Sequence, residues 1–363
     1  MADGGSPNRA RHAATWFVTR KYPPRFGGME LLSWELTTRL GRRRPSRVLA
    51  LRRGTPWLPL FVVASAFRIV AAARRGDIAL VHLGDPVLAP LGRLARQFGI
   101  PVCVTVHGLD VTFAHPLYRR WLRGSFERLD AYVCISSAAR EAAIAAGAPA
   151  ARTSVVGVGL TPPSDPAAPA TREADRLLFV GRLVRRKGLE WFVRAVLPKL
   201  AEKRAAIRLA VIGAGPERTA VESAAAAAGV ADRIDWLGPL PDEAKWAWFR
   251  RATVCVMPNV AVPGDLEGFG IAALEAAAAA CPLVASDLEG LRDAVEHGEG
   301  GLLVPAQDVD AWVATVRSLL DDPRSAQALG ERARAWVRTH RDWEAVCDRY
   351  EALFDALTAG RAR

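Results

Sequence analysis

The stretch from Pro258 to Ser286, PNVAVPGDLEGFGIAALEAAAAACPLVAS, constrains the fold of this chain more than any other. A turn-rich loop leads through Gly268 and Gly270 into an alanine-rich segment that favours a helix, and a short apolar run follows it. Loop, helix and strand in this order make half of an α/β unit. A helix approached through glycines also leaves its first N–H groups free for an anion, usually a phosphate.

Two glutamates flank the start of this helix. Glu267 and Glu275 lie eight residues apart in the sequence, which is about 12 Å if the whole interval were helical. A phosphate repels a carboxylate. However, a carboxylate can accept hydrogen bonds from hydroxyls that lie at either end of a molecule whose centre is a phosphate. A sugar, a diphosphate and a nucleoside joined in that order have this layout. The alternative is an ordinary surface helix with a glycine-rich entrance, because short motifs also occur by chance.

Length and cysteine content narrow the class of protein. With 363 residues, two domains are expected. No uninterrupted apolar run reaches the roughly 18–20 residues of a membrane-spanning helix, since the best candidate, Trp57–Phe67, contains Pro59 and is followed by Arg68. The first residues lack the apolar core of a secretory signal. The five cysteines form no Cys-x-x-Cys pair, which argues for a reduced, cytosolic chain. Those in apolar runs are expected to be buried in strands: Cys103, Cys134 and Cys255.

Positive charge is concentrated in the first half of the chain. Up to Pro163 there are 23 Lys and Arg against 9 Asp and Glu, a net +14, and the remainder has 26 against 29, a net −3. This excess suits a solvated basic face, an anionic membrane surface or nucleic acid. Nucleic acid ranks last, because no aromatic residues are interleaved with the charge. The basic residues form two groups: Arg39, Arg42, Arg43, Arg44, Arg47, Arg52 and Arg53, and then Arg119, Arg120 and Arg123.

The first half alternates apolar runs with segments of helical spacing. Helices are predicted at Met29–Leu40, at Leu58–Ala73, where a buried helix is expected, and at Leu88–Phe98. The apolar runs are typical of parallel strands that are covered by helices on both faces. The predicted strands are Ala14–Thr19, Arg47–Leu51, Ile78–Leu83, Pro101–Val106, Ala131–Ile135 and Ser154–Val158.

Two loops of this half are candidates for ligand contact. Gly27 and Gly28 separate the first strand from the first helix, where backbone can approach a phosphate closely, although a glycine pair can also be a plain turn. His107 follows directly after the strand that begins at Pro101. A histidine at a strand end is more often structural, but ligands of open α/β sheets bind at the C-terminal ends of strands, so this position raises the chance that His107 is functional.

A proline-rich segment, Thr161–Pro169, predicts a linker and a domain boundary at residues 163 and 164. Beyond it a second α/β half begins. Its predicted strands are Arg176–Val180, Ile207–Ile212, Ile234–Leu237, Val254–Met257, Leu283–Ala285 and Leu302–Val304. A ligand is expected in a cleft between the two halves.

Basic residues follow the first strand of the second half. Arg182 comes directly after Gly181, and of the next three cations Lys187 is the one we expect to face a ligand. Several cations on such a loop suit a diphosphate, although they can also simply face solvent. The chain's one Asp-x-Asp triplet, Asp308–Asp310, precedes a helix and is interpreted as a cap and not as a metal site.

Taken together, these residues resemble a GT-B glycosyltransferase of the large retaining family that includes the bacterial phosphatidylinositol mannosyltransferases and sucrose synthase. The strongest signature is Glu-x-Phe-Gly-x-x-x-x-Glu, from Glu267 to Glu275. The others, in family order, are Gly27-Gly28-Met29-Glu30, His107-Gly108-Leu109-Asp110, Gly181-Arg182-Leu183 with Lys187-Gly188, and Gly213-Ala214-Gly215-Pro216. The resemblance implies two Rossmann-like α/β domains with parallel sheets facing a central cleft. Residues 1–163 would bind the acceptor and 164–344 the donor, with a C-terminal helix, about 345–363, packing back on the first domain.

The resemblance also implies roles for single residues. Glu267 would bind the hexose hydroxyls of a nucleotide-sugar donor, Glu275 would hold the ribose diol, and His107 would sit by the reacting sugar. Arg182 and Lys187 would neutralise the diphosphate and help the nucleoside diphosphate to leave. The remaining donor contacts would come from Gly28, Gly215, Phe269, Gly270 and Ile271.

Enzymes of this kind need neither a metal nor another cofactor, and retention is usually explained by front-face attack. Two departures from the family pattern stand out. Val158-Gly159 replaces a common Asn-Gly, and Ala280 replaces a glycine that usually ends the helix. A left-handed cap at Ala280 would be strained by about 1 kcal/mol, or another ending would replace it.

The sequence thus predicts a metal-independent, retaining hexosyltransferase that uses GDP-mannose or a UDP-sugar and acts on an envelope polysaccharide or a lipid-linked acceptor. It would work in the cytoplasm, in solution or on the inner face of an anionic membrane, without nucleic acid. The alternatives are the same chemistry on a soluble small molecule, or a nucleotide-sugar or nucleic-acid binding protein without catalysis. A dinucleotide oxidoreductase is disfavoured, because the loop at Gly213 lacks the third glycine of that fingerprint.

Overall fold

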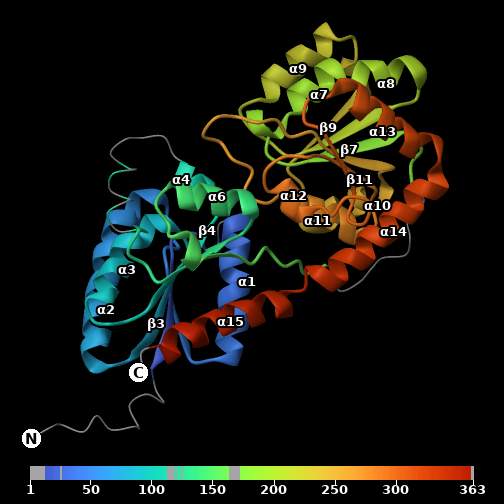
Figure 1. Ribbon diagram of the computed structural model, residues 1–363. Helices are drawn as coiled ribbons and strands as arrows, with labels where there is room; N and C mark the ends of the chain where they lie inside the picture. Colours follow the sequence, from blue (N-terminus) through green and yellow to red (C-terminus); the bar gives the residue numbers. More distant parts are fainter. Residues whose placement is uncertain are drawn as a thin grey trace, which may run out of the picture. The chain divides into compact units, whose positions relative to one another are not determined.

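The computed structural model describes residues 13–24, 27–112, 118, 120, 122, 124, 126–162 and 172–360. The chain forms two compact units (Figure 1). Unit 1 comprises Met1–Gly159 and Trp343–Arg363, and unit 2 comprises Leu160–Asp342. Most of the proline-rich segment lies outside the described residues, as do Arg119 and Arg123.

Unit 1 is built on a parallel sheet of six strands in the order β2-β1-β3-β4-β5-β6. Every neighbouring pair is parallel. The four central strands are largely buried, as their apolar runs predicted, while the edge strands β2 and β6 are more exposed. The order reverses between β1 and β3, so the loops after these two strands open the crevice where such sheets bind ligands. The strands are β1 (Ala14–Thr19), β2 (Ser46–Ala50), β3 (Ile78–Leu83), β4 (Val102–Val106), β5 (Ala131–Cys134) and β6 (Thr153–Val155).

Helices cover both faces of this sheet. In Figure 1, α1 and α15 lie on one face and α2 and α3 on the other. The helices are α1 (Gly28–Arg43), α2 (Leu58–Arg75), α3 (Ala89–Arg96), α4 (Leu109–Thr112), α6 (Ser137–Ala145) and α15 (Trp343–Ala359), with short 3₁₀ turns at Thr55–Trp57, Pro86–Leu88 and Ala150–Arg152.

Helix α2 corrects two expectations. It was predicted to be buried, but only Ser65, Ile69 and Ala72 of its side chains are buried, because one face alone packs on the unit. No segment was expected to suit a membrane span, yet among the described residues one helical stretch, Thr55–Arg75, is long and apolar enough by length and composition. The exposed large apolar side chains of the helix are Leu60, Val63 and Phe67, whereas Phe61 is only partly exposed.

The last helix, α15, belongs to unit 1, although it is separated from the rest of that unit by all of unit 2. Tyr350 reaches the sheet, where its hydroxyl lies 2.9 Å from Thr105 Oγ1. On the helix surface, Arg43 of α1 forms ion pairs with Asp348 and Glu351, both at 2.7 Å. Part of the basic group of residues 39–44 is therefore neutralised within the unit and does not form a free cationic face.

Unit 2 holds a second parallel sheet of six strands, in the order β12-β11-β10-β7-β8-β9. The reversal falls between β7 and β10, so the loops after these strands frame its crevice. The strands are β7 (Arg176–Val180), β8 (Arg208–Ile212), β9 (Ile234–Gly238), β10 (Val254–Met257), β11 (Leu283–Ser286) and β12 (Leu302–Val304). The helices are α7 (Leu189–Ala195), α8 (Leu197–Lys203), α9 (Arg218–Ala227), α10 (Asp242–Arg251), α11 (Ile271–Ala278), α12 (Leu291–Ala294), α13 (Val309–Asp321) and α14 (Pro323–His340), with 3₁₀ turns at Arg185–Lys187 and Ala231–Arg233.

The core and caps of the units agree with the sequence pattern. In unit 2, the buried Trp312 packs edge-on against Phe192, with ring centroids 5.9 Å apart. All five cysteines are buried and free. Asp308 accepts a hydrogen bond from the backbone N–H of Ala311 at 3.0 Å and so caps α13, while Asp310 pairs with Lys199. The interpretation of the Asp-x-Asp triplet as a cap is confirmed.

Helix α11 ends in strained backbone. Ala280 has φ +54°, in the left-handed region that favours glycine. The backbone N–H of Ala280 donates to the carbonyl of Ala277, and that of Cys281 donates to Ala276, so the ending is a Schellman motif with Ala280 at its left-handed position. Of the two endings that the missing glycine left open, the strained left-handed cap is therefore the one present.

Ala280→Gly is expected to stabilise the protein. Glycine relieves the strain of the left-handed alanine, which stabilises the fold by about 1–2 kcal/mol. The greater backbone entropy of glycine in the unfolded chain opposes this gain by about 0.5–1 kcal/mol. The midpoint of urea unfolding should rise by the equivalent of about 0.5–1 kcal/mol. An unchanged or lower midpoint would show that the strain is relieved elsewhere.

Candidate functional site

The crevice of unit 2 contains a buried cluster of charged side chains. Lys187 comes from the 3₁₀ turn after β7, and its Nζ lies 2.6 Å from Glu267 Oε2. Asn259, which follows β10, donates to the same oxygen at 2.9 Å. Arg186 contributes a second cation, 2.9 Å from Asp265 and 3.5 Å from Glu267. The loops after β7 and β10 are thus joined by ion pairs at the switch point.

These contacts decide the ionisation of Glu267. Burial alone would raise the pKa of its carboxyl, but the charge of Lys187, followed by that of Arg186, lowers the pKa below its ordinary value. Glu267 is therefore an anion at neutral pH, held by cations on one side. The backbone N–H of Glu267 also donates to Glu289 at 2.6 Å, and burial raises the pKa of that second carboxyl.

The N-terminus of α11 lies directly after this glutamate. Phe269 is buried, and Gly270 takes φ +86°, which turns the chain into the helix that begins at Ile271. A side chain at Gly270 would place Cβ 2.6 Å from Leu291, so both space and conformation require glycine here. No side chain caps α11, so its first N–H groups are free to attract an anion.

Glu275 lies one turn further along α11, and its partner was not predicted from the sequence. Lys245 of α10 places its Nζ 2.7 Å from Glu275 Oε1 and 2.8 Å from Asp242. Burial raises the pKa of the Glu275 carboxyl, and Lys245 opposes this increase. The pair leaves a nearly buried carboxylate within a helical turn of the anion-attracting N-terminus.

Glycines let the loops of the crevice lie against one another. A Cβ at Gly188 would stand 1.8 Å from the carbonyl oxygen of Pro258, and one at Gly215 would stand 2.2 Å from the carbonyl oxygen of Leu183. Gly215 therefore has a packing role that is independent of any ligand. The side chain of Arg182, on the loop after β7, is exposed and forms none of the side-chain hydrogen bonds or ion pairs found among the described residues.

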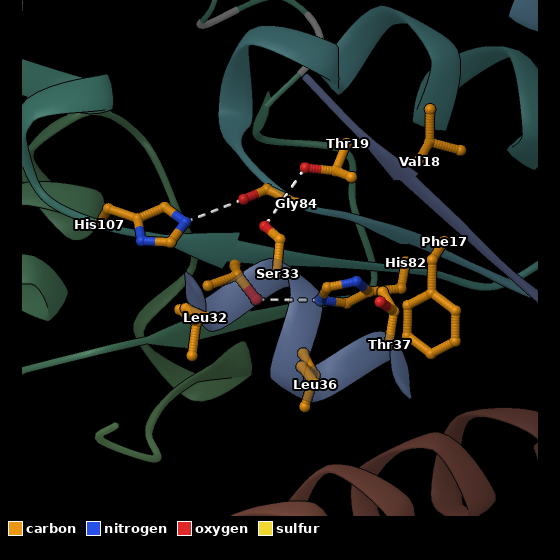
Figure 2. Close-up of a pocket in the computed structure, with 11 residues that line it drawn as sticks. Phe17, Val18, Thr19, Leu32, Ser33, Leu36, Thr37, His82, Gly84 and His107 are labelled. Atoms are coloured by element: carbon orange, nitrogen blue, oxygen red, sulfur yellow. Dashed lines mark hydrogen bonds between the residues drawn. The ribbon is translucent and has the colours of Figure 1, made fainter. Parts of the chain in front are cut away.

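In unit 1, His107 lies at the C-terminal end of β4 and is buried. Its Nε2 is 2.9 Å from the carbonyl oxygen of Gly84 (Figure 2). A carbonyl only accepts hydrogen bonds, so Nε2 of His107 carries a proton and donates it to Gly84. The backbone N–H of His107 donates to Asp110, which fixes the start of the loop.

The surroundings of His107 are polar and tightly packed. Figure 2 shows Thr19 and Ser33 in contact, with their hydroxyls 3.3 Å apart, beside a cavity of about 10 Å³. That volume is about the size of one water molecule, so the cavity is not a substrate pocket. Asp85, after β3, pairs with Arg20 of the loop after β1 at 2.9 Å. Gly28 is exposed at the first turn of α1, where N–H groups are free.

The structure thus brings Lys187 to Glu267 just before the N-terminus of α11, while Glu275 lies further along that helix and pairs with Lys245 of α10. His107 and Gly28 lie in unit 1, both beyond the ends of strands. No cluster of three or more His, Cys, Asp or Glu side chains among the described residues is placed to hold a metal ion. The crevice instead offers cations and backbone N–H groups, which bind anions, beside carboxylates, which accept hydrogen bonds from hydroxyls.

Comparisons with known proteins identify the family. Residues 8–162 match the model "Glycosyltransferase Family 4", and residues 174–322 match "Glycosyl transferases group 1". A GDP-mannose-dependent alpha-(1-6)-phosphatidylinositol monomannoside mannosyltransferase of Mycolicibacterium smegmatis is 31% identical over 360 residues, which cover 90% of this chain and 94% of that protein. The chain belongs to the family 4 glycosyltransferases.

Two further likenesses agree with this family. A D-inositol 3-phosphate glycosyltransferase of Corynebacterium efficiens is 35% identical over 185 residues, 50% of this chain and 42% of that protein. The solved sucrose-phosphate synthase of Thermosynechococcus elongatus superposes with a TM-score of 0.76 at 22% identity, covering 96% of this chain and 100% of that one. The fold is therefore GT-B, with two Rossmann-like units built on parallel sheets.

Proposed function

We propose that this glycosyltransferase moves a hexose from a nucleotide-diphosphate sugar to an envelope polysaccharide or a lipid-linked acceptor, with retention at the anomeric carbon and without a metal. The observation that carries the proposal is the buried Lys187–Glu267 pair beside the uncapped N-terminus of α11. The mannosyltransferase relative, which is GDP-mannose-dependent and named for a phosphatidylinositol acceptor, supports this class of donor and acceptor.

The donor diphosphate would lie at the N-terminus of α11, with Lys187 and Arg182 as its cations. Lys187 already forms an ion pair with Glu267 in the structure, which contains no ligand. When the donor binds, Lys187 would share its three N–H donors between the Glu267 carboxylate and the phosphate. Glu267 would accept hydrogen bonds from the hexose hydroxyls, and Glu275 from the ribose diol. His107 of unit 1, whose ring is held by Gly84, would face the reacting sugar.

In the reaction, the bond from the anomeric carbon to the donor phosphate oxygen breaks as the acceptor oxygen attacks from the same face. The acceptor proton passes to that departing phosphate oxygen, so retention needs no covalent intermediate on the protein. Cations and N–H groups at the diphosphate stabilise the charge that develops there. Because they are held in place by the ion pairs of the crevice, little reorganisation is required during the step.

A soluble acceptor is the second candidate. The D-inositol 3-phosphate glycosyltransferase relative, named for a small phosphorylated acceptor, favours it. Both candidates would place the enzyme on the cytoplasmic side, in solution or peripheral to the membrane. Thermal-shift screening of GDP-mannose, UDP-glucose and other nucleotide sugars, followed by transfer assays with lipid-linked and soluble acceptors, would separate them. Stabilisation by no nucleotide sugar would contradict the proposal.

Lys245→Met is expected to weaken donor binding about tenfold or more, because hydrogen bonds to charged groups contribute about 1.5–3 kcal/mol. Loss of the cation raises the pKa of Glu275 further, and the protonated carboxyl is a poorer acceptor for the ribose diol. Donor affinity should therefore decline as the pH falls, and the decline should begin at a higher pH in the variant than in the wild type. Titration calorimetry across pH would measure this. Lys245→Arg, which keeps the charge, should retain most of the affinity, and identical pH profiles for Lys245→Met and the wild type would exclude the positioning role.

A further inference from the structure

The outer face of α2 carries a ridge of large apolar side chains with no partner in the described structure. Leu60, Val63 and Phe67 lie at helical spacing and are 59%, 52% and 73% exposed. Trp57, in the preceding 3₁₀ turn, is 46% exposed. Four of the eight most exposed large apolar residues described belong to this short segment, and a contiguous apolar patch of this kind marks an interaction surface.

The same segment is strongly basic. Residues 52–76 contain five arginines and no Asp or Glu. Arg53 holds its guanidinium 4.8 Å from the ring of Trp57, so charge and apolar surface lie together. Arg75 pairs with Asp77 just beyond the helix, and the others project from exposed positions: Arg52, Arg53, Arg68 and Arg74.

The opposite face of α2 fixes the helix to unit 1. Ser65, Ile69 and Ala72 are buried, and the helix runs along α3 on one face of the sheet (Figure 1). An arrangement in which α2 crossed a bilayer would remove this packing. A helix that stays on its domain and exposes an apolar ridge with flanking arginines has the character of an interfacial helix, which lies in the plane of the membrane surface.

We propose that this surface, defined by Trp57, Leu60, Val63, Phe67 and the flanking Arg52, Arg53, Arg68 and Arg74, docks the enzyme onto a membrane that contains anionic lipid. The apolar ridge enters the boundary between headgroups and acyl chains, and the arginines meet the lipid phosphates. The basic group at residues 39–44 is not the docking face, because Arg43 is committed to the acidic side chains of α15.

The positive charge of this surface favours an anionic membrane over a second copy of the chain or a nucleic acid as its partner. A second copy of the chain would bring the four arginines of its own surface against the first four, which repel. Nucleic acid would neutralise the arginines, but its phosphates offer no contact to Leu60 or Val63. Only an anionic membrane provides an apolar layer beneath a negatively charged one. The proposal concerns where the enzyme is held and is independent of which donor and acceptor it uses.

Vesicle co-sedimentation of the full chain tests the surface. The probes are phosphatidylcholine vesicles with and without about one third of phosphatidylglycerol. The wild type should bind the anionic vesicles at least tenfold more tightly than the neutral ones, and less tightly as salt is raised. Leu60→Ser/Phe67→Ser should lose at least tenfold of this affinity. Arg53→Gln/Arg68→Gln should lose on the order of 30-fold, from about 1 kcal/mol per arginine.

The matched control substitutions lie at exposed positions outside the proposed docking surface. Val48→Ser, at an exposed apolar position on β2, and Arg317→Gln/Arg338→Gln, at exposed sites of unit 2, should bind vesicles as the wild type does. Donor thermal shifts should be unchanged in every variant, so failure of docking is distinguishable from failure of the proposed function. Equal binding to both kinds of vesicle, or full binding by Leu60→Ser/Phe67→Ser, would overturn the proposal. So would a dimer that this double variant dissociates, because the ridge would then bind a second copy.

Discussion

Lys187→Ala is expected to lower kcat by about 10³-fold, the upper range for losing one preorganised charge-stabilising donor. The side chain is nearly buried, and its Nζ lies 2.6 Å from Glu267, so no other cation replaces it without rearrangement. Arg186 is already committed to Asp265, and Arg182 lies on the exposed part of the loop. Initial rates with the donor that gives the largest thermal shift would measure the effect.

The same substitution will also destabilise the fold, and the two effects must be separated. Breaking a buried ion pair by removing one partner typically costs about 3–5 kcal/mol, because a charge is left unpaired. Lys187→Ala/Glu267→Gln leaves no unpaired charge, so it should regain most of the stability and none of the activity. Arg185→Ala, on the same turn but exposed, should keep activity within about twofold. Near-wild-type turnover in Lys187→Ala would contradict the assignment of this residue.

Glu267→Gln is expected to lower kcat about 10²- to 10³-fold with little change of shape, because an amide cannot accept the hexose hydroxyl bonds as strongly as a carboxylate. Glu222→Gln, an exposed change of the same kind on α9, should leave turnover unchanged. If Glu267→Gln were as active as the control, the carboxylate would have no role in donor binding and would serve only to hold Lys187.

The pH dependence of stability gives Glu267 a second test. Its native pKa lies below the unfolded value near 4.5, so the ionised side chain stabilises the fold fully above that value. This contribution is lost as the pH falls through the lower native pKa. Unfolding of the wild type between pH 5 and pH 3 should therefore depend on pH more steeply than unfolding of Glu267→Gln, which has no proton to bind there.

Much of the fold could be predicted from the sequence because strand position depends on local apolar runs. Ala14–Thr19, Ile78–Leu83, Arg176–Val180 and Val254–Met257 were predicted to the residue. The sequence left open whether Ala280 would adopt the left-handed conformation or the helix would end in another way, and the structure shows the left-handed conformation. What failed was the exposure of α2, because helical spacing gives the faces of a helix but not which of them meets the core.

The candidate site could be predicted only in part, for a related reason. The Glu267 and Lys187 positions follow from loops that begin at strand ends, which are readable in sequence. Lys245 reaches Glu275 across 30 residues of chain, and Glu289 meets the backbone of Glu267 across 22, so nothing in their local pattern marks them. Arg43 of α1 pairs with Asp348 of α15, which lies 305 residues further along the chain. The sequence alone therefore did not reveal that part of the basic charge at residues 39–44 is neutralised within unit 1.

A structure of the enzyme with the nucleoside diphosphate of its preferred donor would show directly where the phosphates bind. We expect phosphate oxygens at hydrogen-bond distance from Lys187 Nζ and the backbone N–H of Ile271, with the ribose diol on Glu275. Phosphates bound elsewhere, or a ribose without contact to Glu275 while Glu267 faces away from the ligand, would contradict this expectation.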